Sequence, residues 1–103
     1  MPSSKDYLAF VLDQLSLLYP ISYRAMMGEY ILYYRGKIVG GIYDDRLLVK
    51  PTDAAKKMMP DAPLETPYEG AKPMLLVEEI DDREFLKDLF DATANELPDP
   101  KKP

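Results

Sequence analysis

Residues 23–50 decide the fold of this 103-residue chain, and they read YRAMMGEYILYYRGKIVGGIYDDRLLVK. Tyr, Ile and Val are frequent in this stretch, and its apolar residues either alternate with polar ones or run continuously, as in β-strands. Arg35-Gly36 and Asp44-Asp45 interrupt it with residue types that suit tight hairpin turns. We therefore predict an antiparallel meander of three strands, over Tyr23–Tyr34, Lys37–Tyr43 and Arg46–Lys50.

Helical patterns flank this stretch on both sides. After the capping residues Ser3 and Ser4, leucine and valine recur at helical spacing until Pro20, which predicts a first helix. Thr52-Asp53 starts a short helix over Ala54–Met59, and Asp81-Asp82-Arg83-Glu84 resembles a capping box before a longer helix that ends near Leu97. Between these helices we predict two short strands, over Leu64–Tyr68 and Met74–Val77. The proline at position 67 places the first of them at a sheet edge.

The predicted order defines an α+β fold, with a two-layer α-β3-α-β2-α arrangement and an antiparallel sheet. Residues 1–97 are expected to form a single domain, because a chain of this length has no room for a second. Residues 98–103 form a tail rich in Pro and Lys. Gly28 is expected to mark a bulge in the long first strand.

Composition excludes several classes of function. The chain has no cysteine and no histidine, which rules out disulfides, thiolate nucleophiles, Cys/His zinc sites and an imidazole base. We predict no metal and no cofactor. A formal net charge of −5 disfavours direct binding to nucleic acid. The sequence contains no signal peptide and no apolar run near the ~20 residues of a membrane span, so we expect a cytoplasmic protein without membrane contact.

The two faces of the predicted meander differ in character. With two-residue turns, Tyr33 lies opposite Ile38, and Ile42 lies opposite Leu47. One face is then wholly apolar and is predicted to be covered by helices: Ile31, Tyr33, Ile38, Gly40, Ile42, Leu47 and Val49. The other face is rich in tyrosine, has cations at its border and is the candidate surface for a protein partner or a homodimer: Tyr30, Leu32, Tyr34, Lys37, Val39, Gly41, Tyr43, Arg46, Leu48 and Lys50. Cover by other parts of the same chain is the alternative explanation for this second face.

Candidate catalytic groups are sparse, and we predict no catalytic residue. The pairs Asp44-Asp45 and Asp81-Asp82 occupy a predicted turn and a predicted helix cap, where acids have structural roles. Glu29 lies in a strand and is expected to form an ion pair with Arg24. Gly40-Gly41 lacks the strand–loop–helix context of a phosphate-binding loop, so we attribute it to close packing of a helix or an aromatic ring. An enzyme would need Glu29, Glu65 or Asp44 to converge with Arg24 and a tyrosine in a cleft.

The run from Arg24 to Pro51 resembles the N-terminal domain of the TfoX/Sxy competence-regulator family. The matching positions include Arg24, Met26, Gly28, Tyr30, Gly36 and Lys37, followed by Tyr33, Asp44, Leu47 and Lys50. Pro67, Tyr68, Gly70 and Lys72 match the second half of the domain, so the resemblance covers Ser22 to Leu97. Glu29 stands where the family has a second glycine, and full-length members carry a further C-terminal domain.

This resemblance implies a fold similar to secretion-chaperone-like and YgaC-like domains. It also implies a non-enzymatic role in transcriptional control of bacterial DNA uptake, exerted through protein contacts. A small-ligand or peptide-binding domain, with a groove between helix and sheet lined by Tyr and Met, is the alternative function.

Overall fold

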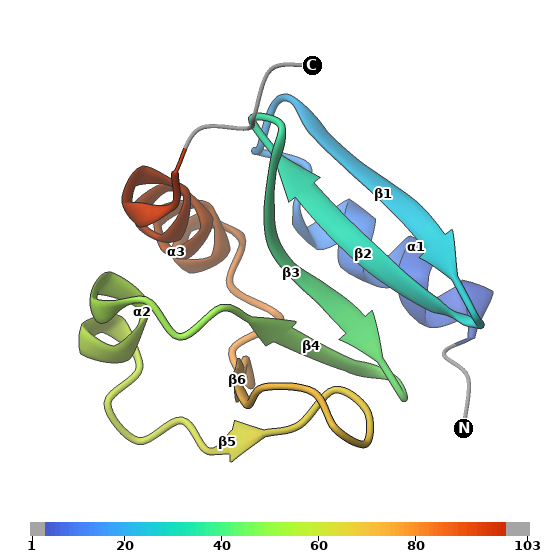
Figure 1. The fold of residues 1–103 in the computed structure, drawn as a ribbon. Helices are drawn as coiled ribbons and strands as arrows, with labels where there is room; N and C mark the ends of the chain where they lie inside the picture. Colours follow the sequence, from blue (N-terminus) through green and yellow to red (C-terminus); the bar gives the residue numbers. More distant parts are fainter. Residues whose placement is uncertain (1–3, 99–103) are drawn as a thin grey trace.

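Three tight turns fold residues 21–49 into a four-stranded meander in the computed structural model of the chain, which describes residues 4–98 (Figure 1). The strands are β1 (Ile21–Met26), β2 (Glu29–Tyr34), β3 (Lys37–Tyr43) and β4 (Arg46–Val49). Both central residues of each turn have positive φ, as hairpin turns of type I′ require: Met27 and Gly28, Arg35 and Gly36, Asp44 and Asp45.

The predicted long strand Tyr23–Tyr34, with a bulge at Gly28, is therefore wrong. Residues Met27 and Gly28 form a turn, and Met26 pairs with Glu29 across it. This turn was not predicted because methionine is uncommon at the central positions of hairpin turns. The order of elements is accordingly helix, four strands, helix, two strands, helix.

The three helices occur where they were predicted, but α1 ends at Gln14 and not at Pro20, because residues 15–17 form a turn. Helix α1 (Lys5–Gln14) is capped by Ser4, helix α2 (Asp53–Met58) by Thr52 and helix α3 (Arg83–Glu96) by Asp82. Each cap side chain accepts a hydrogen bond from a backbone amide of the first turn, which satisfies a group that the helix leaves unpaired. No helix within residues 4–98 is long and apolar enough to span a bilayer.

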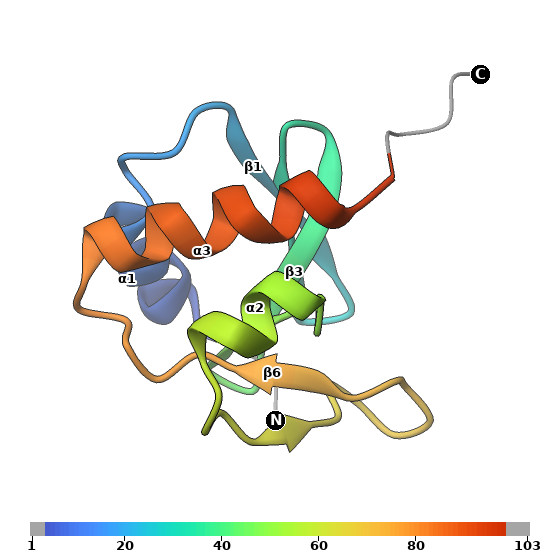
Figure 2. The ribbon, with the colours of Figure 1, turned by 90° about the vertical axis from the view of Figure 1, so that its left-hand side faces the viewer.

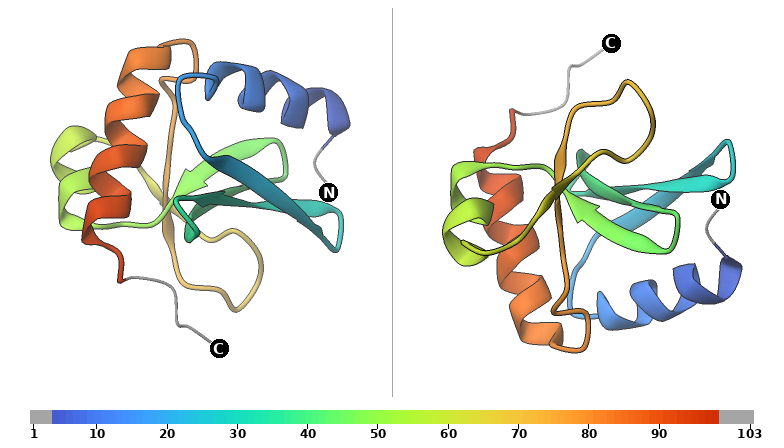
Figure 3. Two further views of the ribbon diagram at one scale, coloured as in Figure 1. Left: turned by 90° about the horizontal axis from the view of Figure 1, so that it is seen from above. Right: turned by 90° about the horizontal axis from the view of Figure 1, so that it is seen from below.

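All six strands belong to one antiparallel sheet with the order β1-β2-β3-β4-β6-β5. Strands β5 (Leu64–Glu65) and β6 (Met74–Leu76) are shorter than predicted, and β5 lies at an edge as Pro67 indicated. Figure 3 shows α1 on one side of the meander and the loop that joins β5 and β6 on the other. Figure 2 shows α3 running alongside α2, and these two helices are in contact.

A bulge in β3 sets the faces of the meander. The predicted pairs Tyr33–Ile38 and Ile42–Leu47 are both present. However, Leu32 pairs with Gly40, so Val39 is an extra residue in β3. An extra residue reverses which side chains share a face beyond that point, because side chains alternate with a period of two. Tyr30 consequently lies opposite Ile42 and points to the same side.

The hydrophobic core lies on that side of the sheet. All three helices contribute to it, through residues such as Val11 of α1, Ala55 of α2 and Phe90 of α3. Strand residues of the same cluster include Leu32, Ile42 and Val49. Helices and sheet thus bury one continuous set of apolar side chains, which is the main source of stability for a chain without disulfides.

Gly40 and Gly41 allow unusually close packing within the sheet. A Cβ atom on Gly40 would lie 2.1 Å from the backbone oxygen of Leu48. A Cβ on Gly41 would lie 2.6 Å from the Tyr43 ring and 2.6 Å from the backbone oxygen of Tyr30. The aromatic ring at Gly41 agrees with the predicted reason for this glycine pair. At Gly40 the close neighbour is strand backbone, and not the predicted helix or ring.

Candidate functional site

The tyrosine-rich face predicted for a partner is mostly buried within the chain itself. Six of its members are less than a tenth exposed: Tyr30, Leu32, Tyr34, Val39, Tyr43 and Leu48. The prediction that this set forms an open surface is wrong, and cover by the same chain, the alternative explanation, is correct. The bulge at Val39 accounts for three of them, because it puts Tyr30, Leu32 and Tyr34 on the core side of the sheet. Tyr43 stays on the outer side, beside Tyr68 of the β5–β6 loop.

Two cations at the border of that face, Lys37 and Arg46, have side-chain contacts within the chain. The Lys37 Nζ atom donates to the carbonyl oxygen of Ala94 at 2.9 Å, which ties the β2–β3 hairpin to α3. Arg46 forms an ion pair with Glu65, which holds the short strand β5 against β4. Both side chains are partly exposed, but their contacts fasten elements together.

Tyr34 and Arg35 form a second link to α3. The Tyr34 hydroxyl donates to Asp91 Oδ1 at 2.5 Å, and Arg35 Nη2 donates to the same oxygen at 2.7 Å. Lys87 approaches the other carboxylate oxygen at 2.9 Å. Burial raises the pKa of Tyr34, and its hydrogen bond to Asp91 raises it further. This cluster fixes the position of α3 on the hairpin.

The side chains that do face outward come from the set predicted to be covered. Ile38 is 40% exposed, and Ile31 and Tyr33 are half-buried. They lie on the side of the sheet away from α1, where Tyr33 pairs with Ile38 across β2 and β3. The assignment of Ile31, Tyr33 and Ile38 to the covered face is therefore wrong, again because of the bulge.

Two adjacent hollows lie on this side of the sheet, and we call them together the outer groove. The first, of about 290 Å³, is lined by Tyr33, Ile38, Lys50 and Leu97, among others. The second, of about 490 Å³, lies where the β5–β6 loop crosses β3 and β4; its lining includes Tyr43, Lys50, Pro67, Tyr68, Lys72 and Met74. Lys50 borders both hollows, so they lie next to each other.

Aromatic rings and cations define the character of the outer groove. The rings of Tyr43 and Tyr68 are 6.2 Å apart, and Tyr68 is 57% exposed. Burial raises the pKa of Tyr43, and the neighbouring Tyr68 and Glu29 raise it further, so its hydroxyl stays protonated at neutral pH. Lys50 and Lys72 make no ion pair within residues 4–98. The groove therefore combines apolar surface, a hydroxyl and two positive charges.

The outer groove is not evident from the sequence. The predicted face groups Tyr43 and Lys50 with tyrosines of β2 that lie on the core side. Pro67, Tyr68 and Lys72, which complete the groove, are distant from Tyr43 and Lys50 along the chain. Only the pairing of β4 with β6 brings the loop over the meander. The groove also differs in place from the predicted one, since it lies between a loop and the sheet instead of between a helix and the sheet.

The residues that carry the family resemblance have mainly structural roles here. Gly28 and Gly36 occupy turn positions with φ of 86° and 76°. Tyr30 is buried, and its ring meets the Tyr23 ring edge-on at 5.8 Å. Arg24 and Met26 are exposed on β1. The motif therefore marks the hairpins of the fold rather than a cluster of reactive groups.

The carboxylates considered for catalysis also have partners. Glu29 accepts hydrogen bonds from the Asp44 amide at 3.0 and 3.2 Å, which joins the first turn to the third. Glu65 is paired with Arg46. Arg24 makes no ion pair in the part of the chain that the structure describes, so the predicted pair with Glu29 is not formed.

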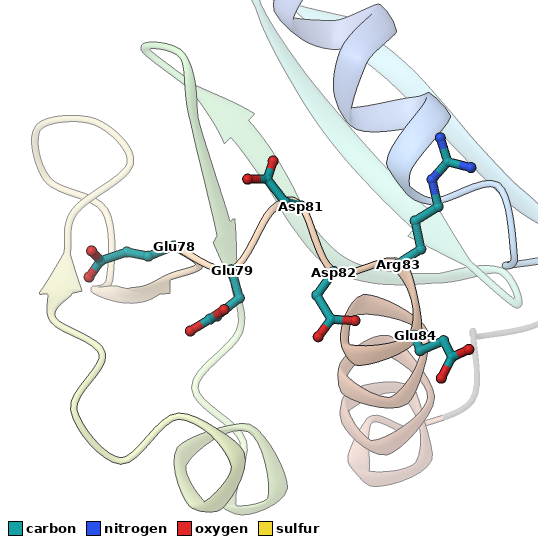
Figure 4. A pocket seen from close by; sticks show the side chains of 6 residues that line it. All are labelled: Glu78, Glu79, Asp81, Asp82, Arg83 and Glu84. Atoms are coloured by element: carbon teal, nitrogen blue, oxygen red, sulfur yellow. The ribbon is translucent and has the colours of Figure 1, made fainter.

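An acidic strip precedes α3, and its side chains do not converge. Figure 4 shows Glu78, Glu79, Asp81, Asp82 and Glu84 pointing in different directions around an open hollow. Asp82 caps α3 by accepting from the Phe85 amide at 3.0 Å, one residue later than the capping box of Asp81 and Glu84 predicted. Arg83 points away toward α1, where it pairs with Asp13 at 2.7 Å. No group of three or more acidic side chains suited to a metal ion occurs among the described residues.

Comparison with known proteins places the chain in a family. The sequence profile described as "TfoX N-terminal domain" matches residues 13–96. A protein of Spirochaeta aurantia, described as "Uncharacterized 12.7 kDa protein in trpE 5'region", is 36% identical over 102 residues, covering 98% of this chain and 89% of the relative. No solved structure matches the chain. The chain thus belongs to the TfoX N-terminal domain family, in agreement with the resemblance drawn from its hairpin motif.

Proposed function

We propose that this TfoX N-terminal domain is a non-enzymatic protein-interaction module that binds its partner in the outer groove. The observation that carries the proposal is the placement of partly open apolar side chains, such as Ile38 and Tyr68, beside Lys50 and Lys72. Apolar surface bordered by polar groups is typical of binding sites for proteins. The role that we propose is transcriptional regulation of competence or a related process, as the family resemblance implies.

The chemistry of the groove suits an extended peptide with apolar and acidic side chains. Tyrosine rings and prolines form rigid apolar walls that lose little entropy on binding. Lys50 and Lys72, which have no ion-pair partner among the described residues, would attract carboxylates of the peptide. A partner segment with Pro or an aromatic residue next to Asp or Glu fits these features best.

Direct binding to duplex DNA is not part of the proposal. Each neutralised phosphate needs a well-placed cation, and the chain has a formal net charge of −5. Several cations are also engaged within the chain: Arg35, Arg46, Arg83 and Lys87 all form ion pairs. A fluorescence-anisotropy titration at low salt tests this point. Tight binding that weakens steeply with salt would contradict it.

A peptide-display selection against the purified chain tests the groove. We expect it to enrich acidic peptides that contain Pro or aromatic residues. NMR titration of one selected peptide should shift the amide signals of Tyr33, Ile38 and Lys50 first. The Ile38→Glu variant should lose this binding, because a carboxylate in the first hollow opposes both the apolar contact and the charge of the peptide.

Phe10→Glu is the matched control for Ile38→Glu. Phe10 is 42% exposed, close to the 40% of Ile38, but it lies on α1 at the other side of the sheet. This variant should bind the peptide as the wild type does. A selection without enrichment, or signal shifts confined to α2 and α3, would contradict the proposed site.

The regulatory role is tested in the source organism. Replacing the chromosomal copy by Ile38→Glu should change the transcript levels of DNA-uptake genes in the same direction as a deletion. Phe10→Glu should leave them unchanged. Transcript levels that respond to neither the deletion nor Ile38→Glu would overturn the link to competence while leaving the peptide-binding result intact.

A small organic ligand is the second candidate occupant, favoured by the volume of the hollow beside Tyr43 and Tyr68. About 490 Å³ falls within the range of small-molecule sites. A fragment screen by NMR distinguishes the two candidates. Fragments that bind this hollow with higher affinity than any selected peptide would favour the small ligand.

A further inference from the structure

Strand β1 forms a long, open edge of the sheet. It is the terminal strand in the order β1-β2-β3-β4-β6-β5, and five of its six residues are exposed. Figure 1 shows β2 along one side of β1 and no other strand along its far side within the described residues. The opposite edge is the two-residue strand β5, which offers little to a partner. An open edge of this length is a template for pairing with another strand.

The geometry of the first hairpin identifies which backbone groups of β1 are available. Met26 and Glu29 close a two-residue turn, so Met26, Arg24 and Ser22 exchange hydrogen bonds with β2. Every second residue of β1 thus has its backbone groups directed at β2, and the hydrogen bond from the Arg35 amide to the Pro20 carbonyl extends this pattern by one more pair. The N–H and C=O groups of Ile21, Tyr23 and Ala25 consequently point away from β2. Within residues 4–98, these groups form no backbone hydrogen bond to a turn, loop or helix cap.

Exposed apolar side chains are arranged symmetrically about the middle of this edge. Tyr19 is 90% exposed and Met27 is 96% exposed, and each lies four positions from Tyr23. Tyr23 itself is 48% exposed and Met26 is 39% exposed. Such a cluster of large apolar side chains at a strand edge and its ends favours burial against a partner. A second copy of this chain, running antiparallel along the edge, would bring its own Tyr19 and Met27 to the two ends of β1. Apolar side chains would then meet at both ends of the paired strands.

We propose that two copies of this chain associate through antiparallel pairing of their β1 strands, with the two-fold axis at Tyr23. In this register Tyr23 lies opposite Tyr23 of the partner subunit, and Ile21 lies opposite Ala25 of the partner subunit. Both are pairs of residues whose backbone groups point outward, so each pair exchanges two hydrogen bonds. The exposed Tyr19 of one copy then approaches Met27 of the partner subunit, a favourable contact of sulfur with an aromatic ring.

Charge and strand length select this register over its neighbours. Moving the axis to Arg24 would place two arginines directly opposite each other, which is destabilising. Moving the axis to Ser22 would leave only residues 21–23 paired within the strands. The axis at Tyr23 pairs residues 21–25 and sets Arg24 opposite Ser22 of the partner subunit, whose hydroxyl can accept a hydrogen bond. The outer groove lies over β3 and β4, so the dimer leaves both grooves open.

Sedimentation velocity over a wide range of protein concentration tests the dimer, with two variants at one position. Ala25→Pro removes an outward N–H group and should shift the monomer–dimer equilibrium strongly toward monomer, since proline is tolerated at sheet edges. Ala25→Ser keeps that N–H group and should dimerise as the wild type does. Circular dichroism establishes that both variants are folded. If Ala25→Pro does not fold, Tyr23→Lys takes its place, because an edge lysine opposes strand pairing.

Disulfide trapping tests the register. The chain has no cysteine, so Tyr23→Cys introduces a single thiol. Opposed residues in this register have Cα atoms about 5.5 Å apart, within the range that a disulfide spans. We expect Tyr23→Cys to form a covalent dimer under mild oxidation. Tyr68→Cys, at a comparably exposed position, should stay monomeric.

Three results would overturn the proposal. The first is a chain that stays monomeric at all concentrations. The second is a dimer that is unaffected in Ala25→Pro and in Tyr23→Lys. The third is cross-linking of Tyr68→Cys as rapid as that of Tyr23→Cys, which would locate self-association elsewhere.

Discussion

The hydroxyl of Tyr34 donates a hydrogen bond of 2.5 Å to the carboxylate of Asp91, which joins the end of β2 to the middle of α3. Tyr34 is only 4% exposed, and Asp91 also accepts from Arg35 and Lys87. A buried hydroxyl with a charged acceptor is among the stronger polar contacts in a protein. This contact positions the helix against the hairpin that carries Lys37 and Ile38.

The first prediction concerns the pH dependence that follows from this contact. Burial alone would raise the pKa of Asp91, but the hydrogen bonds from Tyr34 and Lys87 outweigh it and lower the pKa. A carboxyl group with a lowered pKa stabilises the fold above its unfolded pKa of about 4, and this contribution is lost as the pH falls below that value. Asp91→Asn should therefore cost about 1–2 kcal/mol at pH 7. Urea unfolding at neutral and acidic pH should show this difference shrinking in acid.

Equal destabilisation by Asp91→Asn at neutral and acidic pH would contradict the role of its charge.

Tyr34 supplies an independent check at the other end of the pH scale. Its pKa is raised by burial and by Asp91, so the stability it contributes is present below about pH 10 and is lost as the pH rises further. Tyr34→Phe should weaken this alkaline loss, in unfolding curves measured alongside the wild type.

The second prediction tests the faces of the meander. Leu32 is fully buried, whereas the adjacent Ile31 is half-buried on the outer side. Leu32→Ala should cost about 2–5 kcal/mol, the range for a buried leucine. Ile31→Ala should cost about 1 kcal/mol. Chemical denaturation of both variants decides the point, because a straight strand β3 without the bulge would reverse their order.

The third prediction concerns Gly40. A methyl group there would collide with the backbone of β4, at 2.1 Å from the Leu48 oxygen and 2.9 Å from the Val49 Cα atom. Backbone atoms in a paired strand cannot move aside without breaking the ladder, so Gly40→Ala should destabilise by about 3 kcal/mol. Gly70→Ala serves as a contrasting control because its Cβ would meet nothing within 4 Å, although its positive φ adds some strain. A smaller thermal shift for Gly40→Ala than for Gly70→Ala would contradict this packing.

The fourth prediction concerns Met27, whose φ is 53° and whose side chain is 96% exposed. A left-handed conformation is unfavourable for methionine, and its exposure means that no packing within the chain is lost when the side chain changes. Met27→Asn creates the Asn-Gly pair preferred in type I′ turns. The midpoint of thermal unfolding should rise, with a gain of about 0.5–1 kcal/mol in the free energy of unfolding. An unchanged or lower midpoint would indicate a different turn.

The fifth prediction concerns Thr93, which is fully buried in α3. Its hydroxyl oxygen has no hydrogen-bond partner among the described residues. A buried polar group without a partner costs stability, so an apolar residue of the same shape should be tolerated or favoured. Thr93→Val should raise the free energy of unfolding by about 1 kcal/mol. Destabilisation on denaturant titration would show that the hydroxyl is bonded after all.

Local chemistry explains why so much of the fold could be predicted. Caps such as Ser4, Thr52 and Asp82 act on amides within one turn of the chain, and leucine spacing determines which side of a helix is apolar. The turns at Arg35-Gly36 and Asp44-Asp45 set the pairs Tyr33–Ile38 and Ile42–Leu47 for the same reason. The turn at Met27-Gly28 escaped prediction because only its glycine is a typical turn residue.

The candidate site could not be predicted, since it depends on contacts between distant parts of the chain. Both faces of the predicted meander carry many apolar side chains. The alternation of residues along the strands near Val39 therefore does not show which face is buried. The single extra residue in β3 decides which face is buried, because it changes which side chains of β2 share a face with those of β4. The pairing of β4 with β6 then brought Pro67, Tyr68 and Lys72 over Tyr43 and Lys50.

The sequence by itself thus determined the helices, two of the three hairpin turns and the family, because each depends on residues close together in the chain. Tertiary structure alone decided which tyrosines are core and which border the outer groove. It also decided that β1 is left as an open edge. These outcomes follow from the order and register of the strands. Order and register depend on the burial of side chains over the whole sheet, so no short stretch of residues determines them.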